Sequence, residues 1–190
     1  FTLITNNSRI LSTENLYFTV VSQSTDNEGT TTLAMRLNTN IEDCYMDFVY
    51  TLAADDYMMD MSIQPHNMQW ALAQNMSSLE MQWNQLIPQQ EKGRKFEEKY
   101  AQLQYMFVGG DIEKLSEMKA DRAKESARLK WIAYKDQFFS TVLIAGDAFE
   151  STQMESTPLN ALSRHIKEYK TTASLPFDIT GKKNVDLKYY

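Results

Sequence analysis

The side chains best suited to chemistry are few in this sequence and stand far apart. The two histidines are His66 and His165. Helical metal sites typically place two histidines one turn apart with a carboxylate nearby, and neither histidine has a second one at that spacing. A histidine needs a partner group beside it to transfer a proton or to bind a metal, so we expect both to be structural or solvated. The sequence therefore predicts no metal ligands and no cofactor.

The single cysteine, Cys44, excludes an internal disulfide and a cysteine-ligated zinc or iron–sulfur site built by this chain alone. It begins a segment of alternating apolar residues, and no histidine or arginine stands beside it in the sequence to activate the thiol. We expect Cys44 to be a buried core residue.

Motifs for nucleophilic and phosphate chemistry are missing as well. No Gly-x-Ser-x-Gly sequence occurs, and Gly109-Gly110 is followed by Asp111, which would repel a phosphate. The adjacent carboxylates of Asp55 and Asp56 suit a turn, because neighbours in a strand point to opposite faces. A carboxylate pair facing across a cleft, as in glycosidases, stays open at this stage. The sequence nevertheless favours a protein that is not an enzyme.

Composition narrows the class further. The 190 residues contain 19 Lys and Arg against 25 Asp and Glu, a formal net charge of −6, which argues against binding to nucleic acid or to anionic lipid. Hydrophobic residues make up 43%, too many for a disordered chain. No apolar run reaches the ~18 residues that a membrane-spanning helix needs.

Alternation of apolar and polar residues dominates the chain and predicts strands with one buried face. In 44–52, for example, Met46, Phe48 and Tyr50 alternate with Asp47 and Thr51. The segments with this pattern are 44–52, 57–64, 79–84 and 100–107, with further strands expected at 14–21, 31–38 and 139–145. We therefore expect an all-β, mainly antiparallel sandwich. No break in composition divides it, so a single domain over 1–190 is predicted.

One or two short helices are expected beside the strands. Residues 157–169 place Pro158 at a first helical position and repeat Leu159, Leu162 and Ile166 at helical spacing. Residues 111–128 are rich in helix formers but have a thin apolar stripe, so we expect either a helix or a long hairpin arm there.

The stretch 91–99 mixes both signs of charge and is predicted to be a solvated loop, where Arg94→Ala would change stability by less than about 0.5 kcal/mol. An exposed tryptophan on a sandwich face could contact peptide or sugar. The candidate interaction surface consists of Lys92, Arg94, Lys95, Phe96 and Trp70.

Three stretches resemble a known family. Residues 12–18 (STENLYF), 88–97 (PQQEKGRKFE) and 130–140 (KWIAYKDQFFS) resemble the large periplasmic domain of YidC, the bacterial inner-membrane insertase of the YidC/Oxa/Alb group. With gaps, the resemblance runs from about residue 9 to the end of the chain, and 88–97 is its most specific part.

The resemblance implies a β-supersandwich similar to galactose-mutarotase-like sugar-binding proteins. It places the domain on the periplasmic side of the bacterial inner membrane, between a signal-anchor helix and a five-helix insertase core. The sequence would be an N-terminally truncated portion of that domain, attached to the membrane only through segments that this chain lacks. Insertion in the family belongs to the membrane core, so no insertase residue is carried over to this chain.

Three functions follow as hypotheses. The first is a non-catalytic insertase domain that supports insertion and folding through contacts with nascent membrane proteins, the Sec translocon or chaperones, with strand addition at a sheet edge as one mechanism. The second is an exported carbohydrate-binding β-sandwich. The third, an epimerase-like enzyme on the same fold, is the weakest, because no catalytic histidine and acid can be placed together.

Overall fold

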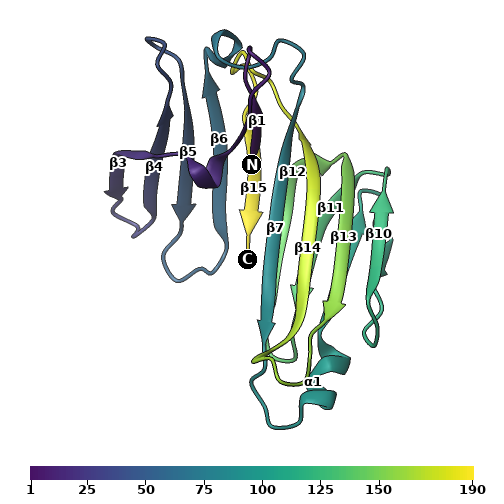
Figure 1. Ribbon diagram of the computed structural model, residues 1–190. Coiled ribbons are helices and arrows are strands. Elements are labelled where there is room, and N and C mark those ends of the chain that lie inside the picture. The colour runs from purple at the N-terminus through teal and green to yellow at the C-terminus, as the bar shows by residue number, and fades with distance from the viewer. The chain divides into compact units, whose positions relative to one another are not determined.

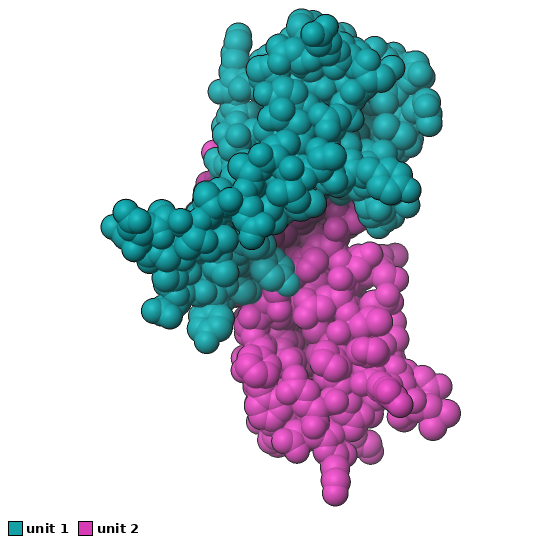
Figure 2. All heavy atoms as spheres, turned by 90° about the vertical axis from the view of Figure 1, so that its left-hand side faces the viewer, with its two compact units in different colours: residues 1–80, 175–190 teal, residues 81–174 magenta.

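The computed structural model describes residues 1–190, which form mainly antiparallel strands and a single α-helix (Figure 1). The all-β prediction is confirmed. The chain divides into two compact units, coloured separately in Figure 2: unit 1 is residues 1–80 and 175–190, and unit 2 is residues 81–174. A single domain over the whole chain stays a prediction.

Unit 1 is organised around an antiparallel sheet of five strands in the order β3-β4-β5-β6-β15. Its remaining strands are a hairpin of β1 and β2, and β1 pairs at Thr2 with Glu80 of β7. The elements are β1 (Thr2–Ile4), β2 (Ile10–Ser12), η1 (Thr13–Asn15), β3 (Thr19–Thr25), β4 (Thr31–Asn38), β5 (Tyr45–Leu52), β6 (Met59–His66), η2 (Met68–Trp70) and β15 (Val185–Tyr189).

The core of unit 1 follows the predicted alternation. Met46 and Phe48 of β5 are 0% and 4% exposed, and Ile63 of β6, opposite Phe48, is fully buried. Cys44 is buried just before β5, as predicted.

Unit 2 is a sandwich of two antiparallel layers, in the orders β10-β13-β14-β7 and β12-β11-β8-β9. Tyr134 of β11 joins the layers, because its hydroxyl donates to the carbonyl of Trp83 in β7 (2.8 Å) and lies 2.7 Å from Oγ1 of Thr171 in β14. The elements are β7 (Ser78–Pro88), α1 (Arg94–Tyr100), β8 (Gln102–Phe107), β9 (Ile112–Lys114), β10 (Asp121–Glu125), β11 (Leu129–Lys135), β12 (Ser140–Phe149), β13 (Ser151–Pro158) and β14 (His165–Pro176).

The helix predicted at 157–169 is wrong. Strand β13 runs to Pro158, a short turn covers 159–164, and β14 begins at His165. The apolar residues at helical spacing belong to two different segments, since Leu159 and Leu162 lie in the turn and Ile166 lies in β14. From Tyr169 onward the buried residues of β14 recur at every second position.

Residues 111–128 form neither of the two structures predicted for them. They contain the short strands β9 and β10, which pair with β8 and β13 and not with each other. Pairing with neighbouring strands here outweighs helix propensity, a weak preference that tertiary context overrides.

The first predicted strand starts later than expected, since residues 13–15 form the 3-10 turn η1 and β3 begins at Thr19. The strand predicted at 139–145 exists as β12.

Candidate functional site

The stretch 91–99 forms most of helix α1, so the prediction of a solvated loop is wrong. Glu97 is only 2% exposed, and its carboxylate accepts the backbone N–H groups of Gln90 (3.1 Å) and Glu91. The helix begins after Gly93, whose carbonyl accepts the N–H of Phe96 (2.7 Å). The mixture of positive and negative residues in this stretch does not indicate that the Glu97 carboxylate points inward and binds the backbone of residues 90 and 91.

Arg94 fixes α1 to the turn between β13 and β14. Its guanidinium donates to three backbone carbonyls of residues 159–165: Leu159 (2.8 Å), Ser163 (3.0 Å) and His165 (3.1 Å). Nε also donates to the Glu98 carboxylate at 2.8 Å. The Arg94 side chain is 13% exposed. Arg94 therefore serves the fold directly, which the sequence did not indicate.

Three exposed members of the predicted interaction surface lie on α1 or just before it. Lys92, Lys95 and Phe96 are all exposed. Phe96 lies one turn before Tyr100, and their ring centroids are 4.9 Å apart. The structure brings these residues together at one end of unit 2, and their use in an interaction stays a prediction.

A buried lysine supports the same end of unit 2. Lys167 in β14 is 1% exposed, and its ammonium donates to the carbonyl of Ala101 after α1 (2.5 Å) and to that of Glu117 (2.6 Å). Burial lowers the pKa of Lys167 to about 8, while the charges of Glu117 and Glu98 oppose this shift.

We expect the stability that Lys167 contributes to rise with pH. Its pKa is lower in the folded chain than in the unfolded one, so between about pH 8 and 10.5 the unfolded chain binds more protons, and raising the pH favours the folded state. Relative to Lys167→Met, the wild type should gain about 2 kcal/mol across this window. Urea unfolding at several pH values measures the difference.

The exposed Lys170→Met, on the same strand, provides the control for that experiment. A pH dependence that Lys167→Met shows and Lys170→Met does not show is then due to the burial of Lys167. A flat profile for Lys167→Met would show that Lys167 keeps an ordinary pKa in the folded chain.

Trp70, the fifth residue of the predicted surface, lies in unit 1 at the end of η2 and is 49% exposed. Its carbonyl accepts the side-chain N–H of Asn6 (3.0 Å). Asn6 belongs to the turn after β1, which forms one wall of a pocket in unit 1.

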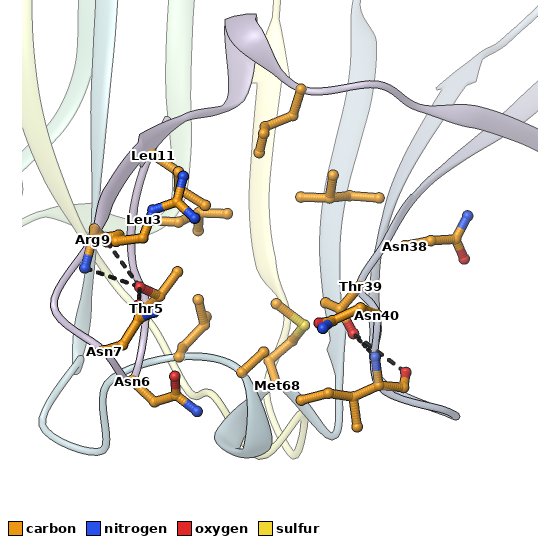
Figure 3. Close-up of a pocket in the computed structure, with 15 residues that line it drawn as sticks. Leu3, Thr5, Asn6, Asn7, Arg9, Leu11, Asn38, Thr39, Asn40 and Met68 are labelled. Atoms are coloured by element: carbon orange, nitrogen blue, oxygen red, sulfur yellow. Dashed lines mark hydrogen bonds between the residues drawn. The ribbon is translucent and has the colours of Figure 1, made fainter.

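That pocket has a volume of about 430 Å³ (Figure 3). Leu3, Leu37 and Leu72 supply apolar, buried lining, and Arg9 brings the one charged side chain. The remaining lining residues are Thr5, Asn6, Asn7, Leu11, Leu16, Asn38, Thr39, Asn40, Ile41, Met68 and Ala71. The lining thus combines apolar side chains with amide and hydroxyl groups and one cation.

The free edge of the unit 1 sheet is the strand β3. It pairs with β4 on one side only, and all seven of its residues, Thr19–Thr25, are exposed. It has neither a charged residue nor a proline, two devices by which sheet edges usually resist pairing with other chains. A register shift between Val20 and Ser22 is the one protective irregularity in its pairing with β4.

The two histidines lie in different units, His66 in unit 1 and His165 in unit 2. No group of three or more His, Cys, Asp or Glu side chains lies close enough to hold a metal ion. His66 stacks on Tyr45 with ring centroids 4.6 Å apart, and its Nε2 lies 3.1 Å from Asp43. His165 contributes its carbonyl to Arg94.

None of the helices has the length and apolar character needed to cross a membrane. The family model of the YidC periplasmic domain matches residues 1–190. The membrane protein insertase YidC of Parabacteroides distasonis is 45% identical over 190 residues, covering 100% of this chain and 29% of the relative.

Two further relatives are also membrane protein insertases YidC. YidC of Azobacteroides pseudotrichonymphae is 46% identical over 187 residues, which cover 98% of this chain and 29% of that protein. YidC of Bacteroides fragilis is 37% identical over 185 residues, covering 97% and 29%. The chain therefore spans less than a third of the length of these relatives.

Proposed function

The chain belongs to the YidC family, as its periplasmic domain, and from this we propose that it is a non-catalytic part of a membrane protein insertase on the periplasmic side of the inner membrane. It would support the insertion and folding of membrane proteins by contacts with nascent chains and with components of the Sec translocon.

The observation that carries this proposal is the open edge of β3. Seven consecutive exposed residues without charge or proline leave backbone N–H and C=O groups available on one side of a sheet. An extended peptide can add to such an edge through main-chain hydrogen bonds, which do not depend on the peptide sequence. This tolerance suits an insertase domain that meets many different nascent chains.

The alternative, a carbohydrate-binding sandwich, receives no support from the unit 1 pocket. Sugar sites commonly stack a ring on an aromatic face, and no aromatic side chain lines this pocket. The Trp70 ring does not line the pocket; the carbonyl of Trp70 accepts a hydrogen bond from Asn6, which does.

We expect Gln23→Lys in a full-length insertase to weaken capture of nascent chains. A lysine in the middle of β3 adds charge to the edge and opposes pairing, as in natural sheets that guard their edges. Ribosome-bound nascent chains should cross-link to a photoreactive residue at position 21, and Gln23→Lys should reduce the yield by about threefold or more.

Asn27→Lys is the matched control, because it adds the same charge to an exposed amide in the turn that follows β3. It should leave the cross-linking yield unchanged. Equal yields for Gln23→Lys and the wild type would contradict the proposal.

A further inference from the structure

Three segments meet at one end of unit 2, which we call the α1 end: residues 89–101, which include α1, and the turns 136–139 and 159–164. The N–H of Gln89 donates to the carbonyl of Arg164 (2.9 Å), and the side chain of Gln90 donates to Asp136 (3.2 Å). Together with the hydrogen bonds of Arg94 to residues 159–165, these contacts hold the three segments together.

The α1 end exposes an unusual amount of apolar surface. Five of the 19 exposed large hydrophobic side chains of the whole chain lie in its 23 residues. They are Phe96 (54% exposed), Tyr100 (44%), Phe138 (50%), Phe139 (69%) and Leu162 (93%). Four of the five are aromatic, so the surface is dominated by rings.

These side chains are presented by ordered turns. The carboxylate of Asp136 accepts the backbone N–H groups of Phe138 (2.6 Å) and Phe139 (2.5 Å). The side-chain oxygen of Asn160 accepts the N–H of Leu162 (2.9 Å). These hydrogen bonds therefore fix the backbone at residues whose apolar side chains are exposed to solvent.

The charge of the α1 end is opposite to that of the chain. Four exposed cations border the rings, Lys92, Lys95, Lys99 and Arg164, and none of their side chains forms an ion pair. Its four acidic residues are Glu97, which is buried, Glu98, which binds Arg94, Asp136, which caps its own turn, and Glu91, which is exposed. Five cations against four carboxylates give the α1 end a net charge of +1, on a chain whose net charge is −6.

We propose that the α1 end docks on the surface of a bilayer containing anionic phospholipid. Aromatic rings are the side chains that prefer the level of the lipid headgroups, and lysines beside them attract anionic lipid. The net negative charge of the whole chain argued against such a surface, but attraction to headgroups acts within about 10 Å, so the local charge decides. The proposal goes beyond the peptide contacts proposed for β3 and does not require them.

The test is flotation of the 190-residue chain with vesicles. Vesicles of phosphatidylethanolamine with about a third phosphatidylglycerol should bind the chain at low salt, and binding should fall as the ionic strength rises. Phe138→Ser combined with Phe139→Ser, and separately Lys92→Glu combined with Lys95→Glu, should each weaken binding by about fivefold or more.

Two matched variants separate the α1 end from general surface effects. Tyr17→Ser removes a ring that is 95% exposed in unit 1, and Lys119→Glu reverses an exposed charge outside the α1 end. Both should bind vesicles like the wild type. The proposal is overturned if the wild type does not float at low salt, or if these controls lose as much binding as the α1-end variants. Cross-linking of the α1 end to a protein partner without vesicle binding would also overturn it.

Discussion

Gly181→Ala should lower the free energy of unfolding by about 3 kcal/mol or more. Gly181 has φ +80°, in the left-handed region that costs an L-residue about 1–2 kcal/mol. A Cβ at this position would also lie 2.2 Å from the carbonyl oxygen of Pro65, a backbone atom that cannot move aside alone. The turn around Gly181 leads into β15, which pairs with β6, so the strain would reach the sheet of unit 1.

Two other glycines separate the causes of that loss. Gly110 has φ +98° with open space around it, so Gly110→Ala should cost only the backbone strain, about 1–2 kcal/mol. Gly109 has open space and no positive φ, so Gly109→Ala should be close to neutral. Urea unfolding of the three variants measures the series. If Gly181→Ala and Gly110→Ala lose the same stability, the contact with Pro65 contributes nothing.

The strands were predictable where alternation is strong and local. In 44–52 and 100–107 one face is apolar at every second residue, and β5 and β8 bury that face. The strand at 139–145 exists as β12, and its buried residues include Leu143 and Ala145. Apolar residues occupy both faces of β12, so alternation alone does not indicate which face is buried.

The errors at 91–99 and 157–169 have a common physical cause. Both segments are decided by contacts with residues more than 60 positions away, which no local period encodes. The guanidinium of Arg94 donates hydrogen bonds to carbonyls of residues 159–165, and the ammonium of Lys167 donates to the carbonyl of Ala101. Each segment therefore takes its structure from the other.

Three of the five residues of the predicted interaction surface, Lys92, Lys95 and Phe96, come from one charged stretch, and all three are exposed in the structure. Their use in an interaction stays a prediction. Phe138 and Phe139 were read only as part of the family resemblance, since the turn made by Asp136 is needed to turn them outward. The β3 edge could not be identified either, because strand order depends on topology and not on the composition of one strand.

Arg94→Ala is expected to cost about 2–4 kcal/mol, far above the value predicted from sequence for a solvated loop. The substitution removes every hydrogen bond of the guanidinium and leaves the carbonyls of Leu159, Ser163 and His165 without their donor. Hydrogen bonds to a charged group contribute about 1.5–3 kcal/mol each, and water that enters the gap replaces part of them. Urea unfolding measures the total loss.

Lys95→Ala is the matched control, because the adjacent side chain is exposed and its loss should stay within about 0.5 kcal/mol. Arg94→Lys should fall between the two, since one ammonium cannot reproduce a planar fork that reaches three carbonyls. Hydrogen exchange adds a local readout: in Arg94→Ala the N–H of Leu159, which donates to Ile166 at 2.9 Å, should exchange faster than in Lys95→Ala. Equal urea midpoints for Arg94→Ala and Lys95→Ala would mean that the helix holds its place without Arg94, and that the shape of the α1 end depends on Glu97 and Lys167 instead.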